Sequence, residues 1–137
     1  MRATGTFSVK SFTPAGLSPE PAAIATGLPV GVATMEKHFE GGIAGRSATL
    51  FTAAFDPATG TGTYVAMESF EGSVDGKDGA FNFAHSATTT GSDSSAQFFA
   101  IVPSSGTGQL AGISGAGGLA IDPDGTHRIW LDYEVAP

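Results

Sequence analysis

Short runs in which apolar and polar residues alternate fill most of this chain, and each run closes on a turn signal. Alternation with a period of two is typical of strands that bury one face. Asp56–Gly60 and Asp122–Gly125 are turn sequences of this kind, because they combine Asp, Pro and Gly. The pattern predicts strands over residues 4–12, 32–40, 43–55, 61–72, 79–90, 96–102, 110–121 and 127–135.

Eight strands in series leave two exposed sheet edges unless the first strand pairs with the last. We therefore expect an all-β fold, a closed eight-stranded antiparallel barrel, forming one domain over residues 1–137. A barrel of eight strands is just wide enough to be filled by side chains or to hold one small ligand. The predicted fold therefore allows a binding site in the interior without requiring one.

The segment 13–29 breaks the alternation, because it carries Pro14, Pro19, Pro21 and Pro29. Each proline lacks a backbone donor and fixes its own φ, which excludes a central strand or a long helix. We expect an ordered loop that crosses one end of the barrel, and loops of this length serve either as lids or as simple straps.

Asp75-Gly76 is a strong signal for a two-residue hairpin turn, since both residues tolerate positive φ. With that turn, the register follows residue by residue on both strands. It predicts that Val74 faces Lys77, Phe70 faces Phe81, Glu68 faces Phe83 and Ala66 faces His85.

One face of this hairpin is far more aromatic than the other, and it carries Tyr64, Glu68, Phe70, Phe81, Phe83 and His85. Burying rings stabilises the fold more than burying the small residues opposite, at ~25 cal/mol per Å². We therefore expect this face to point inward, with Glu68 and His85 roughly 5–8 Å apart as diagonal neighbours. Such a pair can act as general base and acid on a ligand, or it can be purely structural.

Composition excludes several classes of partner. The net charge is −7, and the six Lys and Arg residues are scattered, so nucleic acid and anionic membrane surfaces are not expected as partners. No apolar run approaches the ~20 residues that span a bilayer, so a cytoplasmic location is the default expectation.

The chain has no cysteine, and its three histidines lie on different predicted strands. We expect neither a metal site nor a cofactor.

Two glycine-rich motifs partly match the sequence patterns of known sites but lack the residues or helices that those sites require. Gly106–Gly112 has the glycine spacing of a dinucleotide-binding turn, yet a second glycine-rich stretch follows where a helix is required. Gly112–Ala116 lacks the final glycine and the helix of a nucleophile elbow. Neither motif predicts nucleotide binding or serine hydrolysis.

Several segments resemble an uncharacterised bacterial family, domain of unknown function 3224. They are the first strand from Ala3 and residues 64–72, 79–85, 102–112 and 127–134. The resemblance extends from Ala3 to Tyr133, and Ser-Gly-Thr-Gly-x-Leu-x-Gly is its most specific part. It implies a barrel similar to that of plant allene oxide cyclase and a homo-oligomer. Related barrels bind apolar substrates and guide ring closure. The family's Glu and His correspond to Glu68 and His85.

Three functions remain open from the sequence. The first is a cofactor-independent cyclase or isomerase, in which Glu68 and His85 are catalytic and hold no metal. The second is a non-catalytic binder of an apolar small molecule, and the third is a structural barrel filled by side chains. In the first two, the residues expected to contact the ligand are Tyr64, Phe70, Phe81, Phe83, Phe51, Phe98 and Tyr133.

Overall fold

Eight antiparallel strands in one sheet account for most of the protein, and the only helix in the described region is a single 3-10 turn. The structure is a computed structural model that describes residues 1–136. The strands are β1 (Arg2–Ala15), β2 (Val30–Gly41), β3 (Ile43–Asp56), β4 (Thr61–Val74), β5 (Lys77–Thr90), β6 (Asp93–Ile101), β7 (Ser114–Ile121) and β8 (His127–Glu134), and the helical turn is η1 (Gly108–Leu110).

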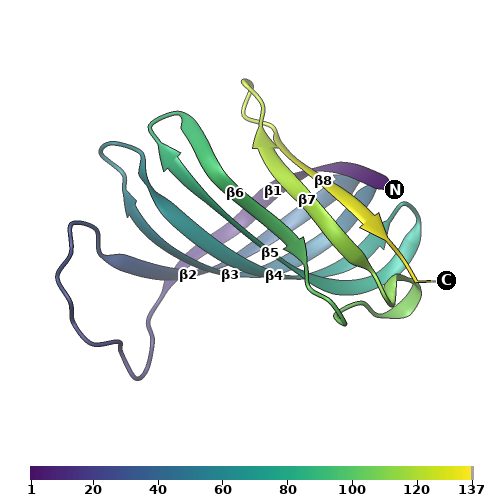
Figure 1. The fold of residues 1–137 in the computed structure, drawn as a ribbon, viewed down its shortest axis with the longest axis horizontal. Helices are drawn as coiled ribbons and strands as arrows, with labels where there is room; N and C mark the ends of the chain where they lie inside the picture. Colours follow the sequence, from purple (N-terminus) through teal and green to yellow (C-terminus); the bar gives the residue numbers. More distant parts are fainter. Residues whose placement is uncertain (137) are drawn as a thin grey trace.

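The sheet closes on itself, because each strand pairs with its neighbour in sequence and β1 pairs with β8 (Figure 1). The pairings differ greatly in extent. The β4–β5 ladder runs along almost the full length of both strands, whereas β6 and β7 meet at the single pair Ala100–Ala116. Closure is therefore continuous on one side of the molecule and reduced to one bridge on the other.

The β4–β5 hairpin confirms the predicted register. Asp75 and Gly76 form the turn with φ of 50° and 81°, and no bulge interrupts the ladder beyond them. Phe70 pairs with Phe81, and Glu68 pairs with Phe83. The aromatic face points inward, as its buried rings show, while the opposite face is exposed on β4 and mostly half-buried on β5.

The first strand is longer than predicted. It continues through Pro14 to Ala15, and Pro14 pairs with Ala33 of β2. This proline is tolerated because β1 pairs with β8 only over Arg2–Phe7, so the later part of β1 is an edge. The rest of the predicted loop, residues 16–29, is almost wholly exposed and projects beyond the strands (Figure 1).

The strand predicted over 110–121 is wrong at its start, because β7 begins only at Ser114. The preceding residues instead run along β5, where β6 does not reach. Thr107 N–H donates to the Ala80 carbonyl at 2.8 Å, and Ala80 N–H donates back to Thr107 Oγ1 at 3.1 Å. The most specific motif of the sequence therefore satisfies backbone groups of β5.

The end of the molecule that holds both termini is filled by side chains. Phe39, Phe70, Phe81, Leu131 and Tyr133 pack there, each at most 4% exposed. Tyr133 donates its phenol proton to Asp75 Oδ2 at 2.7 Å, which joins β8 to the β4–β5 turn. Filling stops partway along the interior, and the other end is open.

Candidate ligand-binding site

A cavity of about 650 Å³ occupies the open half of the interior. We call it the cup; its inner wall includes Phe7, Val9, Met35, Lys37, Phe51, Tyr64, His85, Phe99 and Leu119. The volume lies within the range of small-molecule sites, roughly 300–1,000 Å³. Most of the lining surface is apolar.

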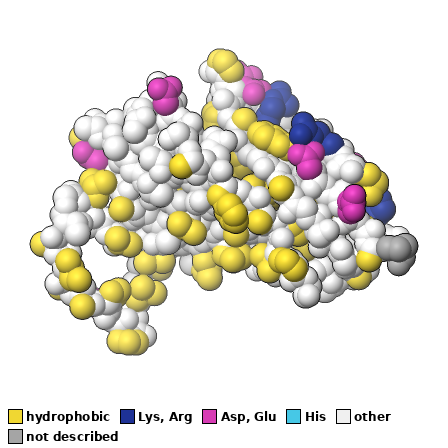
Figure 2. Space-filling model, viewed as in Figure 1, with side chains coloured by type: hydrophobic (Ala, Val, Ile, Leu, Met, Phe, Trp, Pro, Cys, Tyr) yellow, Lys and Arg dark blue, Asp and Glu magenta, His cyan; other side chains and the backbone are white. Residues whose placement is uncertain are grey.

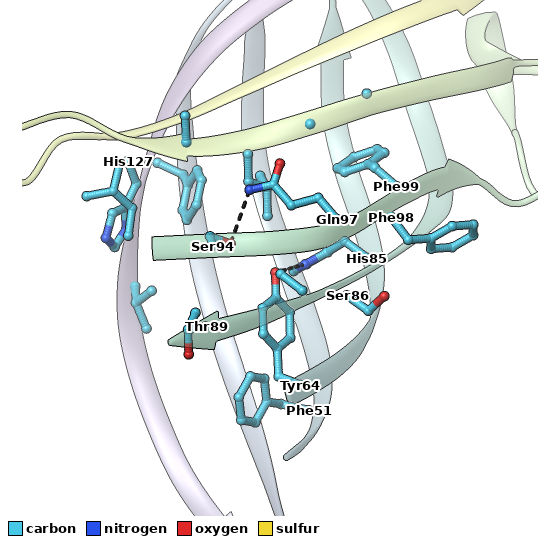
Figure 3. Close-up of a pocket in the computed structure, with 18 of the residues that line it drawn as sticks. Phe51, Tyr64, His85, Ser86, Thr89, Ser94, Gln97, Phe98, Phe99 and His127 are labelled. Atoms are coloured by element: carbon cyan, nitrogen blue, oxygen red, sulfur yellow. Dashed lines mark hydrogen bonds between the residues drawn. The ribbon is translucent and has the colours of Figure 1, made fainter. Parts of the chain in front are cut away.

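Aromatic rings line the cup in two parallel pairs. Phe51 stacks on Tyr64 with centroids 5.5 Å apart and an interplanar angle of 17°. His85 and Phe99 lie nearly parallel at 6.0 Å and 15°. Figure 3 shows Tyr64 beside Phe51 with its hydroxyl directed at His85. The walls therefore present flat, rigid surfaces.

A β-bulge shapes the rim on β6. The register with β5 shifts between Ser86 and Thr88, and Ala96 takes a φ of 51°. The extra residue places Ser94 and Gln97 on the same inner face, where Gln97 Nε2 donates to Ser94 Oγ at 3.2 Å (Figure 3). The rim is consequently polar on this side.

A buried charged cluster forms the floor of the cup. Glu68 is 0% exposed, and its Oε1 accepts the hydroxyl proton of Ser47 at 2.6 Å. Its Oε2 accepts from Lys37 Nζ at 2.6 Å and from His85 Nε2 at 2.5 Å. The series of hydrogen bonds continues toward the cup through His85 Nδ1, which lies 2.8 Å from the Tyr64 hydroxyl. Lys37, Tyr64 and His85 reach the cavity, whereas Glu68 lies behind them.

The hydrogen bonds of this cluster fix its protonation. Burial would raise the pKa of Glu68, but donation from His85, Lys37 and Ser47 outweighs it and lowers this pKa to about 2. Ionised Glu68 can only accept, so His85 Nε2 carries a hydrogen. Burial, together with the charge of Glu68, raises the pKa of Tyr64 to about 12, so the Tyr64 hydroxyl keeps its proton 2.8 Å from His85 Nδ1.

Thr49 sits on the inner face of β3, opposite Glu68 on β4. Its Oγ1 is buried and has no hydrogen-bond partner within the described residues. A buried hydroxyl without a partner costs free energy, and it marks a polar atom that the protein itself leaves unsatisfied beside the charged cluster.

The structure divides the predicted site residues into two groups. The first group lines the cup and consists of Phe51, Tyr64, His85 and Phe98. The cavity does not reach the second group, which lies in the floor or in the filled half: Glu68, Phe70, Phe81, Phe83 and Tyr133. Phe98 is a marginal member, because it is 55% exposed and points outward (Figure 3). Its neighbour Phe99 pairs with His85 and supplies the inward ring of β6.

Sequence reasoning missed Lys37. One signal was present: Lys37 lies two residues from both Met35 and Phe39, so all three share a face of β2. A lysine between two large apolar residues of one face indicates a buried ammonium that needs a partner. Which face of this strand points inward was not decided by the sequence.

No group of three or more His, Asp or Glu side chains in the described residues is arranged to hold a metal ion. Among residues 1–136 there is also no helix with the length and apolarity to cross a membrane.

Comparison with known proteins places the chain in a family. A solved structure of a protein of unknown function from the DUF3224 family of Shewanella oneidensis MR-1 superposes with a TM-score of 0.83 at 28% identity, covering 100% of this chain and 98% of that one. Curated proteins give no match. The model of the family described as "Protein of unknown function (DUF3224)" matches residues 3–133. Because that match spans nearly the whole chain, this protein belongs to the DUF3224 family.

Proposed function

We propose that the cup binds an apolar small molecule, in a barrel of the allene-oxide-cyclase-like kind. The observation that carries this proposal is an apolar cavity of about 650 Å³ that ends on a buried Lys–Glu–His–Tyr cluster. A purely structural interior would be filled by side chains, as the other half of this molecule is.

A cofactor-independent isomerase or cyclase is the activity that this arrangement supports best. His85 Nδ1 would accept a proton from the bound molecule once Tyr64 turns aside, and the carboxylate of Glu68 would stabilise the imidazolium. The same proton would return to a different atom of the ligand, so that product and substrate are isomers. Rigid walls contribute as well, because holding a flexible reactant in one conformation lowers the entropic part of a cyclisation barrier.

The roles differ from those expected from the sequence alone. Glu68 is fully buried, so it acts through His85 and Lys37 and does not touch the ligand. His85 becomes the proton acceptor, Tyr64 a proton donor at the cavity surface, and Lys37 a donor to an oxygen of the ligand.

A non-catalytic binder is the second candidate, and one observation favours it. Both ring nitrogens of His85 are already engaged, by Glu68 at 2.5 Å and by Tyr64 at 2.8 Å. With no free nitrogen in this conformation, the cluster can serve only to recognise a polar group of the ligand.

Native mass spectrometry of freshly purified protein, followed by extraction, tests the site. Val9 lines the cup and is 38% exposed, whereas Val65 is 53% exposed on the outer face and lines no part of the cup. We expect Val9→Glu to lose a retained molecule that Val65→Glu keeps. Retention by both variants would contradict the site. Conversion of the recovered molecule to an isomer by wild-type protein, absent in His85→Phe, would select the enzyme over the binder.

A further inference from the structure

We infer that the cup selects a flat, conjugated molecule with one uncharged carbonyl oxygen, held at the floor by Lys37. This inference rests on the proposed function and deepens it by naming the class of ligand. It follows from three features of the site: the unused donors of Lys37, the balance of charge in the cup, and the parallel rings of its walls.

The Lys37 ammonium has N–H groups that donate to no acceptor within residues 1–136. Its ammonium carries three N–H groups, and within residues 1–136 the acceptor that it reaches is Glu68 Oε2 at 2.6 Å. Its Nζ also lies 5.1 Å from the centroid of Phe7, a contact that attracts the charge but accepts no conventional hydrogen bond. The side chain is only 5% exposed, so water has little access to the remaining N–H groups. An oxygen of a ligand in the cup would satisfy them.

The charge in the cup favours an uncharged oxygen over an anion. The positive charge of Lys37 is balanced by Glu68 directly behind it. Asp93 at the rim adds a negative charge to the lining, and the whole chain carries −7. A carboxylate or phosphate would therefore meet no excess of positive charge at the floor and repulsion at the mouth. An uncharged carbonyl oxygen can accept a hydrogen bond from Lys37 without needing excess positive charge at the floor and without repulsion at the mouth.

The walls favour a flat ligand. Phe51 with Tyr64, and His85 with Phe99, form two nearly parallel pairs, at 17° and 15°. A conjugated molecule that stacks on either pair gains the contribution of an aromatic contact in addition to the area that it buries. An aliphatic molecule of equal size gains the burial but not this contribution.

Three compounds of similar size separate these features: 9-fluorenone, which is flat and has a carbonyl; fluorene, which is flat and lacks the oxygen; and dicyclohexyl ketone, which has the oxygen but no flat face. We expect 9-fluorenone to bind roughly tenfold or more tighter than fluorene, since its oxygen accepts from a charged donor. It should also bind roughly twofold to tenfold tighter than dicyclohexyl ketone. The carbonyl stretch of bound fluorenone should fall below its value in an apolar solvent.

The matched variant is Lys37→Met with Glu68→Gln, which removes both charges together and leaves neither partner unpaired. We expect it to abolish the preference for fluorenone over fluorene and to return the carbonyl stretch to its value in an apolar solvent. Circular dichroism and thermal unfolding check that it folds. If this variant does not fold, the carbonyl stretching frequency of fluorenone bound to the wild-type protein tests the inference by itself. An unshifted band there means that no donor holds the oxygen.

The outcomes distinguish the inference from the function beneath it. If fluorenone and fluorene bind equally and the stretch is unshifted, Lys37 does not select the oxygen, while the cup stands as a binding site. If dicyclohexyl ketone binds as tightly as fluorenone, the requirement for a flat ligand is overturned. If none of the three binds, and Val9→Glu releases no retained molecule, the proposed function itself fails.

Discussion

Lys37 Nζ lies 2.6 Å from Glu68 Oε2, and that same oxygen accepts His85 Nε2 at 2.5 Å. The three side chains come from β2, β4 and β5, and all are at most 5% exposed. One carboxylate oxygen therefore joins a buried cation to the imidazole at the base of the cup. This shared oxygen links a buried ion pair to side chains that line the cup.

Lys37→Met should destabilise the protein by about 3–5 kcal/mol, because it leaves the charge of Glu68 buried without its cation. Adding Glu68→Gln should recover much of that loss, since neither charge is then unpaired. Urea unfolding of both variants measures the difference. Arg46→Met is the control: it breaks the surface pair with Glu71, in which both side chains are more than 60% exposed, and should change little. Equal losses for the single and double variants would contradict the coupling.

Stability should fall with acid in the window set by Glu68. Its pKa is lowered from 4.5 to about 2 in the folded state, so the unfolded chain binds this proton more readily. The contribution is complete above about pH 4.5 and is lost as the pH falls toward 2, and it amounts to about 3 kcal/mol. Urea unfolding between pH 2 and 7 should show this loss in wild type but not in Glu68→Gln. Parallel profiles for the two proteins would disprove the assignment.

Thr49→Val should leave stability unchanged or raise it by about 1 kcal/mol, because it replaces a buried hydroxyl that has no partner with a methyl group of equal size. Ser47→Ala is the matched comparison on the same face of β3. It removes the 2.6 Å hydrogen bond to Glu68 and should cost about 1–3 kcal/mol. Thermal unfolding compares them. A loss in Thr49→Val as large as that in Ser47→Ala would mean that the hydroxyl of Thr49 is satisfied after all.

Gly79→Ala should destabilise the protein by about 1–3 kcal/mol, because a Cβ there would lie 2.1 Å from the Thr107 carbonyl oxygen. The close approach holds the segment before η1 against β5. Gly31→Ala is the control, since a Cβ at Gly31 would meet no atom within 4 Å. Chemical denaturation of the two variants should separate them clearly, and similar midpoints would contradict a packing role for this motif.

Replacing residues 17–28 by Asn-Gly should shift the unfolding midpoint by only a few degrees, because the segment 16–29 is almost wholly exposed and lines no part of the cup. Figure 2 shows hydrophobic side chains spread over this protruding segment, in contrast to the charged side chains along β8. A large drop in the midpoint would show that the segment packs against the strands in solution.

The β4–β5 hairpin shows how much of the fold is local in origin. A two-residue turn at Asp75-Gly76 fixes the register, and the alternation of side chains then fixes which residues face inward. The aromatic face and the approach of His85 to Glu68 follow from these local rules and were predictable. The extent of β1 was not, because Pro14 is acceptable only where β8 has already left β1 unpaired, which is a property of the whole sheet.

The sequence by itself determined the class of fold, the number and order of the strands, and the central pair Glu68–His85, since each depends on alternation and on a turn a few residues away. Only the tertiary structure decided that Lys37 completes this pair and that the interior is filled at one end and open at the other. These features depend on side chains from strands far apart in sequence meeting across the interior. Their meeting is set by the closure of the sheet, which no single strand encodes.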